Sequence, residues 1–259
     1  MTERAIDRRE SSGSTSPKSY GGKSVFKKIV GALALLSVAA CASPYVATPY
    51  DRAAANVRTI TIIDDAGAPE AIAYEVASMG SNFGLIGALV DAGIQAERQG
   101  AVNRALDSVT FDGEAVFERR LSERLTANGY TVNTQSDSAR PKRAFLVSYP
   151  TANGTTDAYM DVVIDHYGYL SAGAFQPFRP SVVAHVRLVS AADPSVILMD
   201  NRIVYNGMTS ADAGVITLSP NPAYVFQNRE ELLADPARMA AGIEDALKQV
   251  ADTAAQLLR

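Results

Sequence analysis

The spacing of hydrophobic residues predicts strands over much of the second half of the chain. Apolar residues alternate with polar ones, or run together with β-branched and aromatic neighbours, in several short segments. These predict strands at 58–64, 130–133, 144–149 and 158–170. Runs at 181–190 and 196–206 flank Ala-Ala-Asp-Pro, a turn sequence, and predict a β-hairpin. Residues 71–78 fit either a strand or a short helix, and 214–224, with two prolines, predict a loop.

Two segments have the 3.6-residue period of amphipathic helices. The first covers 112–128, where Asp112 is a candidate N-cap and Asn128-Gly129 a left-handed stop. The second runs from Pro236, which suits a first helical turn, to Leu258, after a helical turn at 230–234. Their predicted buried faces comprise Val116, Phe117, Leu121 and Leu125 in the first, and Met239, Ile243, Leu247, Val250, Ala254 and Leu257 in the second.

This order of elements predicts an α+β fold. Strands and helices alternate only partly, and a meander of antiparallel strands precedes the last helix. We therefore expect a single mixed, largely antiparallel sheet in residues 58–259, with amphipathic helices packed on it and a C-terminal helix.

The segment from Gly80 to Gly100 combines an apolar run with internal glycines. Between Phe83 and Ile94 only Asp91 is polar, and three glycines lie within the run. Each costs about 1 kcal/mol relative to alanine in a helix. Small residues allow close approach of another backbone. The segment is therefore either a buried helix of its own domain or a surface that meets lipid or another subunit, and we expect a protein partner or self-association there.

Cys41 is the only cysteine, and it ends the run Leu-Leu-Ser-Val-Ala-Ala-Cys at 35–41. Lys27 and Lys28 precede an apolar stretch of about a dozen residues, too short for the roughly 20-residue helix that spans a bilayer. This order of basic residues, apolar residues and a small-residue cleavage site is that of a secretory signal. Residues 25–40 are thus predicted to be the signal and 41–57 a flexible tether. Residues 1–24 are a disordered extension or follow a mis-assigned start codon.

The segment ending at Cys41 resembles the lipobox of bacterial lipoproteins. The resemblance implies cleavage before Cys41, a diacylglycerol group on its sulfur and an acyl chain, such as palmitate, on the new amino group. Several acyl chains anchor a protein stably, whereas one does not. Ala42 in place of Asp implies the outer membrane, on its periplasmic face. In element order alone, residues 58–258 also resemble curli-secretion-type lipoproteins and the N-terminal domain of the Tol-system propeller protein.

Cleavage before Cys41 would make the mature chain strongly acidic. The first 40 residues hold seven of the 24 Lys and Arg but three of the 28 Asp and Glu, which leaves 17 basic and 25 acidic residues and a formal charge of −8. An acidic domain without a basic cluster argues against nucleic-acid binding. With no second cysteine, disulfides are excluded, and two histidines provide too few ligands for a typical zinc site.

The remaining candidates for chemistry are weak. Asp161 and Asp165, four apart on one predicted strand, share a face for acid–base or metal chemistry or form a solvated surface, and His166 points to the opposite face. His185 is expected on the polar side of the hairpin. Asp64-Asp65 would ligate a cation or form a turn. Aromatic residues line a groove or belong to the core, namely Tyr149, Tyr159, Tyr167, Tyr169, Phe175 and Phe178.

The sequence therefore predicts no catalytic, cofactor-binding or metal-ligating residue. Lipidation at Cys41 is the one predicted modification. The leading hypothesis is a lipid-anchored periplasmic protein that acts through protein contacts in envelope assembly, transport or secretion, and is not an enzyme. Two alternatives stay open: a cell-envelope hydrolase that uses Asp161 or Asp165, and an oligomeric membrane-associated secretion component built on Gly80–Gly100.

Overall fold

The computed structural model of the chain describes residues 45–64, 67–75, 84–136, 140, 143–150, 154–173, 175–206 and 214–259. Within 84–95 it describes the course of the helix and not the side chains. Cys41 and the segment around it, Asp65, and residues 80–83 of the glycine-rich segment lie outside this part of the chain. Tyr45–Arg259 forms one compact unit.

Three consecutive strands form the centre of the sheet. They are β4 (Ala158–Ser171), β5 (Phe178–Ser190) and β6 (Ile197–Tyr205), joined by long antiparallel ladders. Alternate residues of β5 point to one buried face, as the hairpin pattern predicts, and are Val182, Ala184, Val186 and Leu188. A run of β-branched residues without internal glycine favours this pleated, half-buried geometry.

Four shorter strands extend the sheet on both sides by parallel pairing. β1 (Thr59–Ile63) lies between β3 (Thr131–Gln135) and the first half of β4, while β2 (Ile72–Glu75) pairs with the second half of β4. β7 (Val215–Leu218) pairs with β6, which gives the order β3-β1-β4-β5-β6-β7. The ambiguous segment at 71–78 is thus a strand in its described part.

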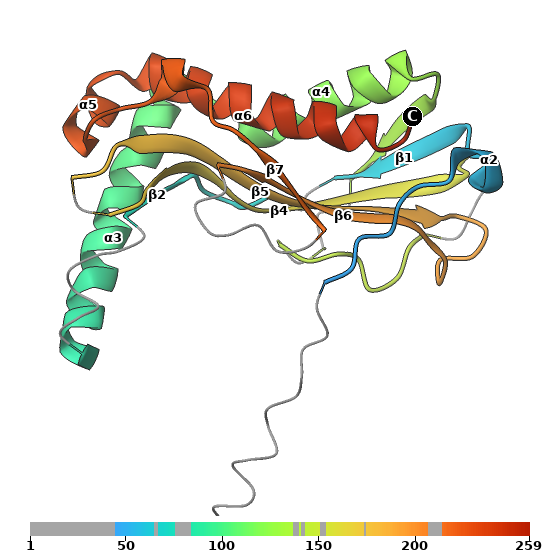
Figure 1. The fold of residues 1–259 in the computed structure, drawn as a ribbon, viewed down its shortest axis with the longest axis horizontal. Coiled ribbons are helices and arrows are strands. Elements are labelled where there is room, and N and C mark those ends of the chain that lie inside the picture. The colour runs from blue at the N-terminus through green and yellow to red at the C-terminus, as the bar shows by residue number, and fades with distance from the viewer. Residues whose placement is uncertain are drawn as a thin grey trace, which may run out of the picture. The chain divides into compact units, whose positions relative to one another are not determined.

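Helices cover one face of the sheet, which we call the helix face (Figure 1). α4 (Gly113–Ala127) and α6 (Pro236–Gln256) pack on each other and on the sheet, with α5 (Arg229–Ala234) and a short 3-10 helix, η2 (Pro222–Tyr224), beside them. The opposite side is called the open face. The predicted α+β fold with a C-terminal helix is confirmed.

Local sequence signals fix both ends of α4 and the start of α6. The Asp112 carboxylate accepts a hydrogen bond from Ala115 N at 3.0 Å, and Gly129 ends α4 with a φ of +91°. Asp235 caps α6 through Arg238 N, and Pro236 occupies its first turn. The buried stripe predicted for α6 is confirmed from Met239 to Ala254, and it forms the core with the sheet.

α3 (Gly84–Asp107) is a long helix whose described side-chain contacts with the domain lie in its C-terminal half. The Asn103 side chain bonds both N and O of Ala71 at 2.9 Å, and the Gln99 side chain accepts a bond from the Tyr74 hydroxyl at 2.7 Å. The other half extends past the sheet on the side of the open face (Figure 1). Among the described residues, no helix is both long and apolar enough to cross a membrane.

Two predicted segments differ in the structure. The strand expected at 144–149 is wrong: both edges of β4 are occupied by other strands, so residues 143–150 cross the open face instead. The loop expected at 214–224 is wrong in part, because Val215–Leu218 forms β7 beside Arg202–Tyr205 of β6. Four consecutive β-favouring residues before Pro220 explain this pairing.

Residues 45–57, which the sequence places in a flexible tether, are instead bound to the domain. Thr48 exchanges two backbone hydrogen bonds with Asp200 of β6, at 2.8 and 3.0 Å. Residues 52–55 form α2 (Arg52–Ala55), and the Arg52 guanidinium donates to the carbonyl of Asn128 at the end of α4. The folded unit therefore begins at Tyr45, within four residues of Cys41.

Candidate functional site

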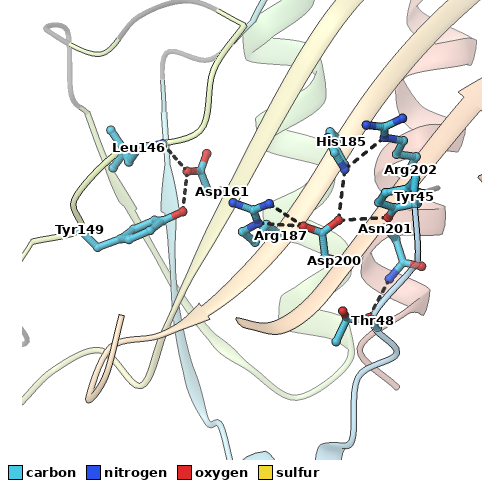
Figure 2. Close-up of polar contacts among 10 residues, drawn as sticks. All are labelled: Tyr45, Thr48, Leu146, Tyr149, Asp161, His185, Arg187, Asp200, Asn201 and Arg202. Atoms are coloured by element: carbon cyan, nitrogen blue, oxygen red, sulfur yellow. Dashed lines mark hydrogen bonds and ion pairs between the residues drawn. The ribbon is translucent and has the colours of Figure 1, made fainter. Parts of the chain in front are cut away.

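A row of charged side chains crosses the open face of the central strands. Asp161 of β4, Arg187 of β5 and Asp200 of β6 are neighbours in the ladder register, so their side chains leave the sheet side by side. Figure 2 shows two chain segments at the ends of this row, residues 45–48 near Asp200 and residues 146–149 beside Asp161. The site consists of the charged row and these two segments.

Asp161 is fully buried and holds the second of these segments. Its carboxylate pairs with Nη2 of Arg140 at 2.6 Å, and neither side chain is exposed. It also accepts hydrogen bonds from Leu146 N and the Tyr149 hydroxyl, both at 2.9 Å (Figure 2). Burial, then the charge of Asp161, raises the pKa of Tyr149. A buried carboxylate that accepts this many hydrogen bonds orders the chain segment that supplies the donors.

Asp200 holds the first segment in the same way. Its carboxylate accepts hydrogen bonds from the Tyr45 hydroxyl at 3.0 Å and from Nε of Arg187 at 2.8 Å (Figure 2). Burial and the hydrogen bond to Asp200 raise the pKa of Tyr45, so its hydroxyl remains a donor. The guanidinium of Arg202 lies 4.4 Å from the centre of the Tyr45 ring, a cation–π contact. Residues 45–48 are therefore fixed by side chains as well as by the pairing of Thr48.

His185 lies between Asp200 and Arg202. Its Nε2 is 3.1 Å from the Asp200 carboxylate and 3.4 Å from Nε of Arg202. Nε of arginine is only a donor, so a single Nε2 cannot satisfy both contacts. The shorter contact, to a carboxylate, requires the proton on Nε2. Burial lowers the pKa of His185 against the opposing effect of Asp200, so the ring is neutral near pH 7.

Asp165 and His166 do not join Asp161. A β-bulge between Ile164 and His166 leaves Asp165 without a ladder partner and exposed. Nε2 of His166 contacts the Ser181 hydroxyl at 3.2 Å, and burial lowers its pKa. The prediction that Asp161 and Asp165 share a solvated face is wrong, because Asp161 is buried in an ion pair whereas Asp165 is exposed to solvent.

Asp64 belongs to a different cluster, with two residues that sequence reasoning missed. Carboxylate oxygens of Asp64, Glu114 and Glu118 lie within 4.8 Å of one another, beside a cavity of about 20 Å³. Oxygen ligands of this kind suit a hard cation. However, acidic side chains often gather without an ion, and Glu114 already accepts a bond from Gly67 N. Asp65, the other half of the predicted pair, lies outside the described residues.

The aromatic residues are divided between core and surface and do not line one groove. Tyr169 and Phe178 lie in the main core, while Tyr149 and Tyr159 stack at 5.7 Å in a small second cluster on the open face. Phe175 is fully exposed. The arrangement of these aromatic side chains therefore does not support the hypothesis that they line a groove.

The site thus contains two latches, by which we mean a buried carboxylate together with the chain segment that it holds on the sheet. Each buried carboxylate of the charged row holds a segment that is not itself a strand of the sheet, and each is paired with an arginine. Arg140, Asp200 and Tyr45 were not singled out by the sequence. The one signal for Asp200 was its place in the hairpin, directly opposite Arg187.

No family model matches the chain, and no curated protein matches it. Among solved structures, the chain is similar to protein XCC0632 from Xanthomonas campestris, of the DUF330 family, with 10% sequence identity and a TM-score of 0.39. The match covers 82% of this chain and 87% of that one.

Proposed function

We propose that this protein is a bacterial lipoprotein, anchored through Cys41 on the periplasmic face of the outer membrane, that acts through protein contacts in envelope assembly, transport or secretion. The observation that carries the proposal is the sequence 25–41, in which a basic pair, an apolar run and small residues lead to the only cysteine. The Ala at position 42 favours the outer membrane by the same resemblance.

The environment of the charged row argues against catalysis by its two carboxylates. The two carboxylates of the charged row, Asp161 and Asp200, are occupied by arginine, tyrosine and backbone donors of the fold itself. A general acid or base needs access to a substrate proton within hydrogen-bond reach. Full burial of Asp161 leaves it no such access.

Replacing Cys41 tests the anchor directly. In Cys41→Ser the acceptor sulfur is lost, so we expect no incorporation of labelled palmitate, retention of the precursor mass and loss of the protein from the outer-membrane fraction. Ser43→Ala, two residues away and outside the lipobox, is the matched control and should mature like the wild type. Normal maturation and fractionation of Cys41→Ser would falsify the proposed anchor.

Site-specific crosslinking tests the protein contacts. An open groove of about 420 Å³ on the helix face lies between the start of α4 and α6, lined among others by Phe111, Arg119 and Glu244. A photo-reactive residue at position 119 or 244 should crosslink to another envelope protein in intact cells. The same residue at Arg104, near the end of α3, serves as a comparison. If neither groove position yields a crosslinked species larger than the monomer, the contact function loses its support on this face.

A further inference from the structure

We propose that the open face of the sheet lies on the membrane surface, and that the N-terminal half of α3 enters the phospholipid layer as a second attachment. This inference rests on the proposed acylation of Cys41. It assigns an orientation and a lipid contact to a chain whose anchor alone specifies neither. Three features of the open face carry it: the short reach from the anchor, the exposed apolar side chains, and the direction of α3.

The reach from Cys41 to the folded unit is short. The domain begins at Tyr45, whose hydroxyl and ring are held by Asp200 and Arg202 on the open face. Four residue steps span at most about 14 Å even when fully extended. A lipid on Cys41 therefore brings the Tyr45 end of the open face close to the bilayer surface. A long flexible tether, which would leave the domain free to rotate, is absent from residues 45–57 because these residues are bound to the sheet and α4.

Exposed apolar side chains occur on the two segments that cross this face. Val46 is 78% exposed and follows Tyr45 directly. Val147 is 99% exposed and lies between Leu146 and Tyr149, which Asp161 holds against the sheet. Ile197, at the start of β6, is 42% exposed. Single exposed valines need no explanation, but here they lie where the anchor must bring the lipid.

Arginines accompany these apolar residues. Arg202 is exposed and flanks Tyr45, and Arg143 is exposed in the segment that carries Val147. Valine and isoleucine reaching the acyl boundary, with guanidinium groups at phosphate height, are the composition that an interfacial contact requires. In a chain with a mature formal charge of −8, such a contact depends on the apolar side chains and the acyl anchor more than on net electrostatic attraction.

α3 points in the same direction. Its described contacts with the domain lie in the C-terminal half, where Arg98, Gln99 and Asn103 form hydrogen bonds and Val102 and Leu106 belong to the core. The N-terminal half extends beyond the open face (Figure 1), and its sequence from Gly84 to Ile94 has Asp91 as the sole polar residue. Eleven residues of helix measure roughly 16 Å, about half of a hydrocarbon core. The segment is thus of a length to enter one leaflet and not to cross the bilayer.

Depth-dependent quenching tests this orientation on the acylated full chain. Once Cys41 is acylated, the protein has no other thiol, so a single introduced cysteine can be labelled selectively. The variants are Val147→Cys on the open face and both Leu89→Cys and Val90→Cys in α3, which lie about 100° apart around the helix. Lys248→Cys on α6, where the lysine side chain is 42% exposed, is the matched control on the helix face.

Each labelled variant is reconstituted in phosphatidylethanolamine–phosphatidylglycerol vesicles with brominated acyl chains. Interfacial segments lie ~5–10 Å into the headgroup–acyl boundary, so we expect at least about two-fold quenching at position 147 and at one or both α3 positions. The label at position 248 should keep its full emission. Quenching at 248, or full emission at 147, overturns the orientation.

Two further readouts separate the remaining outcomes. Intact mass is measured first: a protein without acyl chains on Cys41 contradicts the proposed function, whereas quenching is scored only on acylated protein. Full emission at both 89 and 90 overturns the second attachment. If pyrene at these positions then gives excimer emission, the N-terminal half of α3 contacts a second copy of the chain and not lipid.

Discussion

At the scale of single residues, the open face is organised by two buried carboxylates. Asp161 and Asp200 each hold a segment that is not itself a strand of the sheet, and each is balanced by an arginine. The balance matters because an ion left alone in the interior is far more costly than a buried pair. The guanidinium of Arg140 is already incompletely satisfied, since its Nε has no hydrogen-bond partner within the described part of the chain. Loss of Asp161 would remove the carboxylate that pairs with Arg140 and leave its guanidinium, among the described residues, with only the carbonyl acceptors of Ile63, Asp64 and Ala144.

Asp161→Asn tests this balance. The amide keeps the size of the side chain but removes the negative charge that balances the buried guanidinium of Arg140. We expect the free energy of unfolding to fall by about 3–5 kcal/mol, the usual range when one partner of a buried pair is removed. Urea denaturation measures the change. Asp165→Asn, at the exposed bulge four residues away, should stay within about 0.5 kcal/mol of the wild type. Equal losses in the two variants would contradict the assignment.

The two histidines predict a pH dependence of stability. Burial lowers the pKa of both His166 and His185 in the folded protein. The unfolded chain, with an ordinary pKa near ~6.5, then binds more protons than the folded protein just below that pH. The stabilising contribution of the neutral rings is complete above this pH and is lost as the pH falls toward the lower folded values.

The measurement is the difference in urea midpoint between pH 7.5 and pH 5.0. We expect His185→Gln to reduce this difference, because glutamine can still donate to Asp200 but does not titrate. The double variant with His166→Gln should reduce it further. A midpoint difference that is unchanged in both variants would show that carboxylates alone cause the acid sensitivity.

At the scale of elements, the sequence predicts a structural feature where the residues that determine it lie close together in the chain. The caps of α4 and α6, their apolar stripes and the hairpin of β5 and β6 are encoded within a few residues, and the structure confirms them. The path of 143–150 depends on which neighbours β4 already has, which no local pattern contains. The same reason explains the missed latch residues, since Arg140 and Asp161, or Tyr45 and Asp200, meet only through the folded sheet.

Gly168 of β4 shows how one position fixes the pairing of two elements. Its φ is +138°, and a Cβ there would collide with the backbone of Ile72, its partner in β2. Gly168→Ala should therefore separate β2 from β4 and cost several kcal/mol, whereas Gly154→Ala should cost about 1 kcal/mol, for backbone strain alone. Gly154 is the matched control because its φ is also positive, +78°, and nothing lies within 4 Å of the added carbon.

Hydrogen exchange gives the location of the effect. Amides of Ile72–Glu75 should lose protection in Gly168→Ala, while those of β5 and β6 keep it, because local opening exposes the element that has lost its partner. Similar protection of β2 in the two glycine variants would mean that the close approach at Gly168 is relieved by a small backbone shift and does not decide the pairing.

At the scale of the whole molecule, the docking of residues 45–57 changes what an anchor at Cys41 would do. A flexible tether would keep the domain near the membrane but would not fix the orientation of the domain relative to it. A segment fixed at Tyr45, Thr48 and Arg52 does both, because it connects the open face to the helix ends. The consequence depends on the latch at Asp200 being closed in solution.

Tyr45→Phe tests whether that latch is closed. The variant removes one hydrogen bond to a buried carboxylate, worth about 1.5–3 kcal/mol because the acceptor is charged, and keeps the ring under Arg202. Proteolysis of a locally opened segment follows its open population, so trypsin cleavage at Arg52 should accelerate roughly ten- to hundredfold. Val46→Ala, at the adjacent exposed position, should cleave like the wild type. Cleavage at Arg58 beside β1 reports global unfolding, and its rate should change less than the rate at Arg52. If both sites accelerate equally, Tyr45 stabilises the whole domain and the segment has no separate opening, so it would hold the anchor to the sheet for as long as the domain is folded.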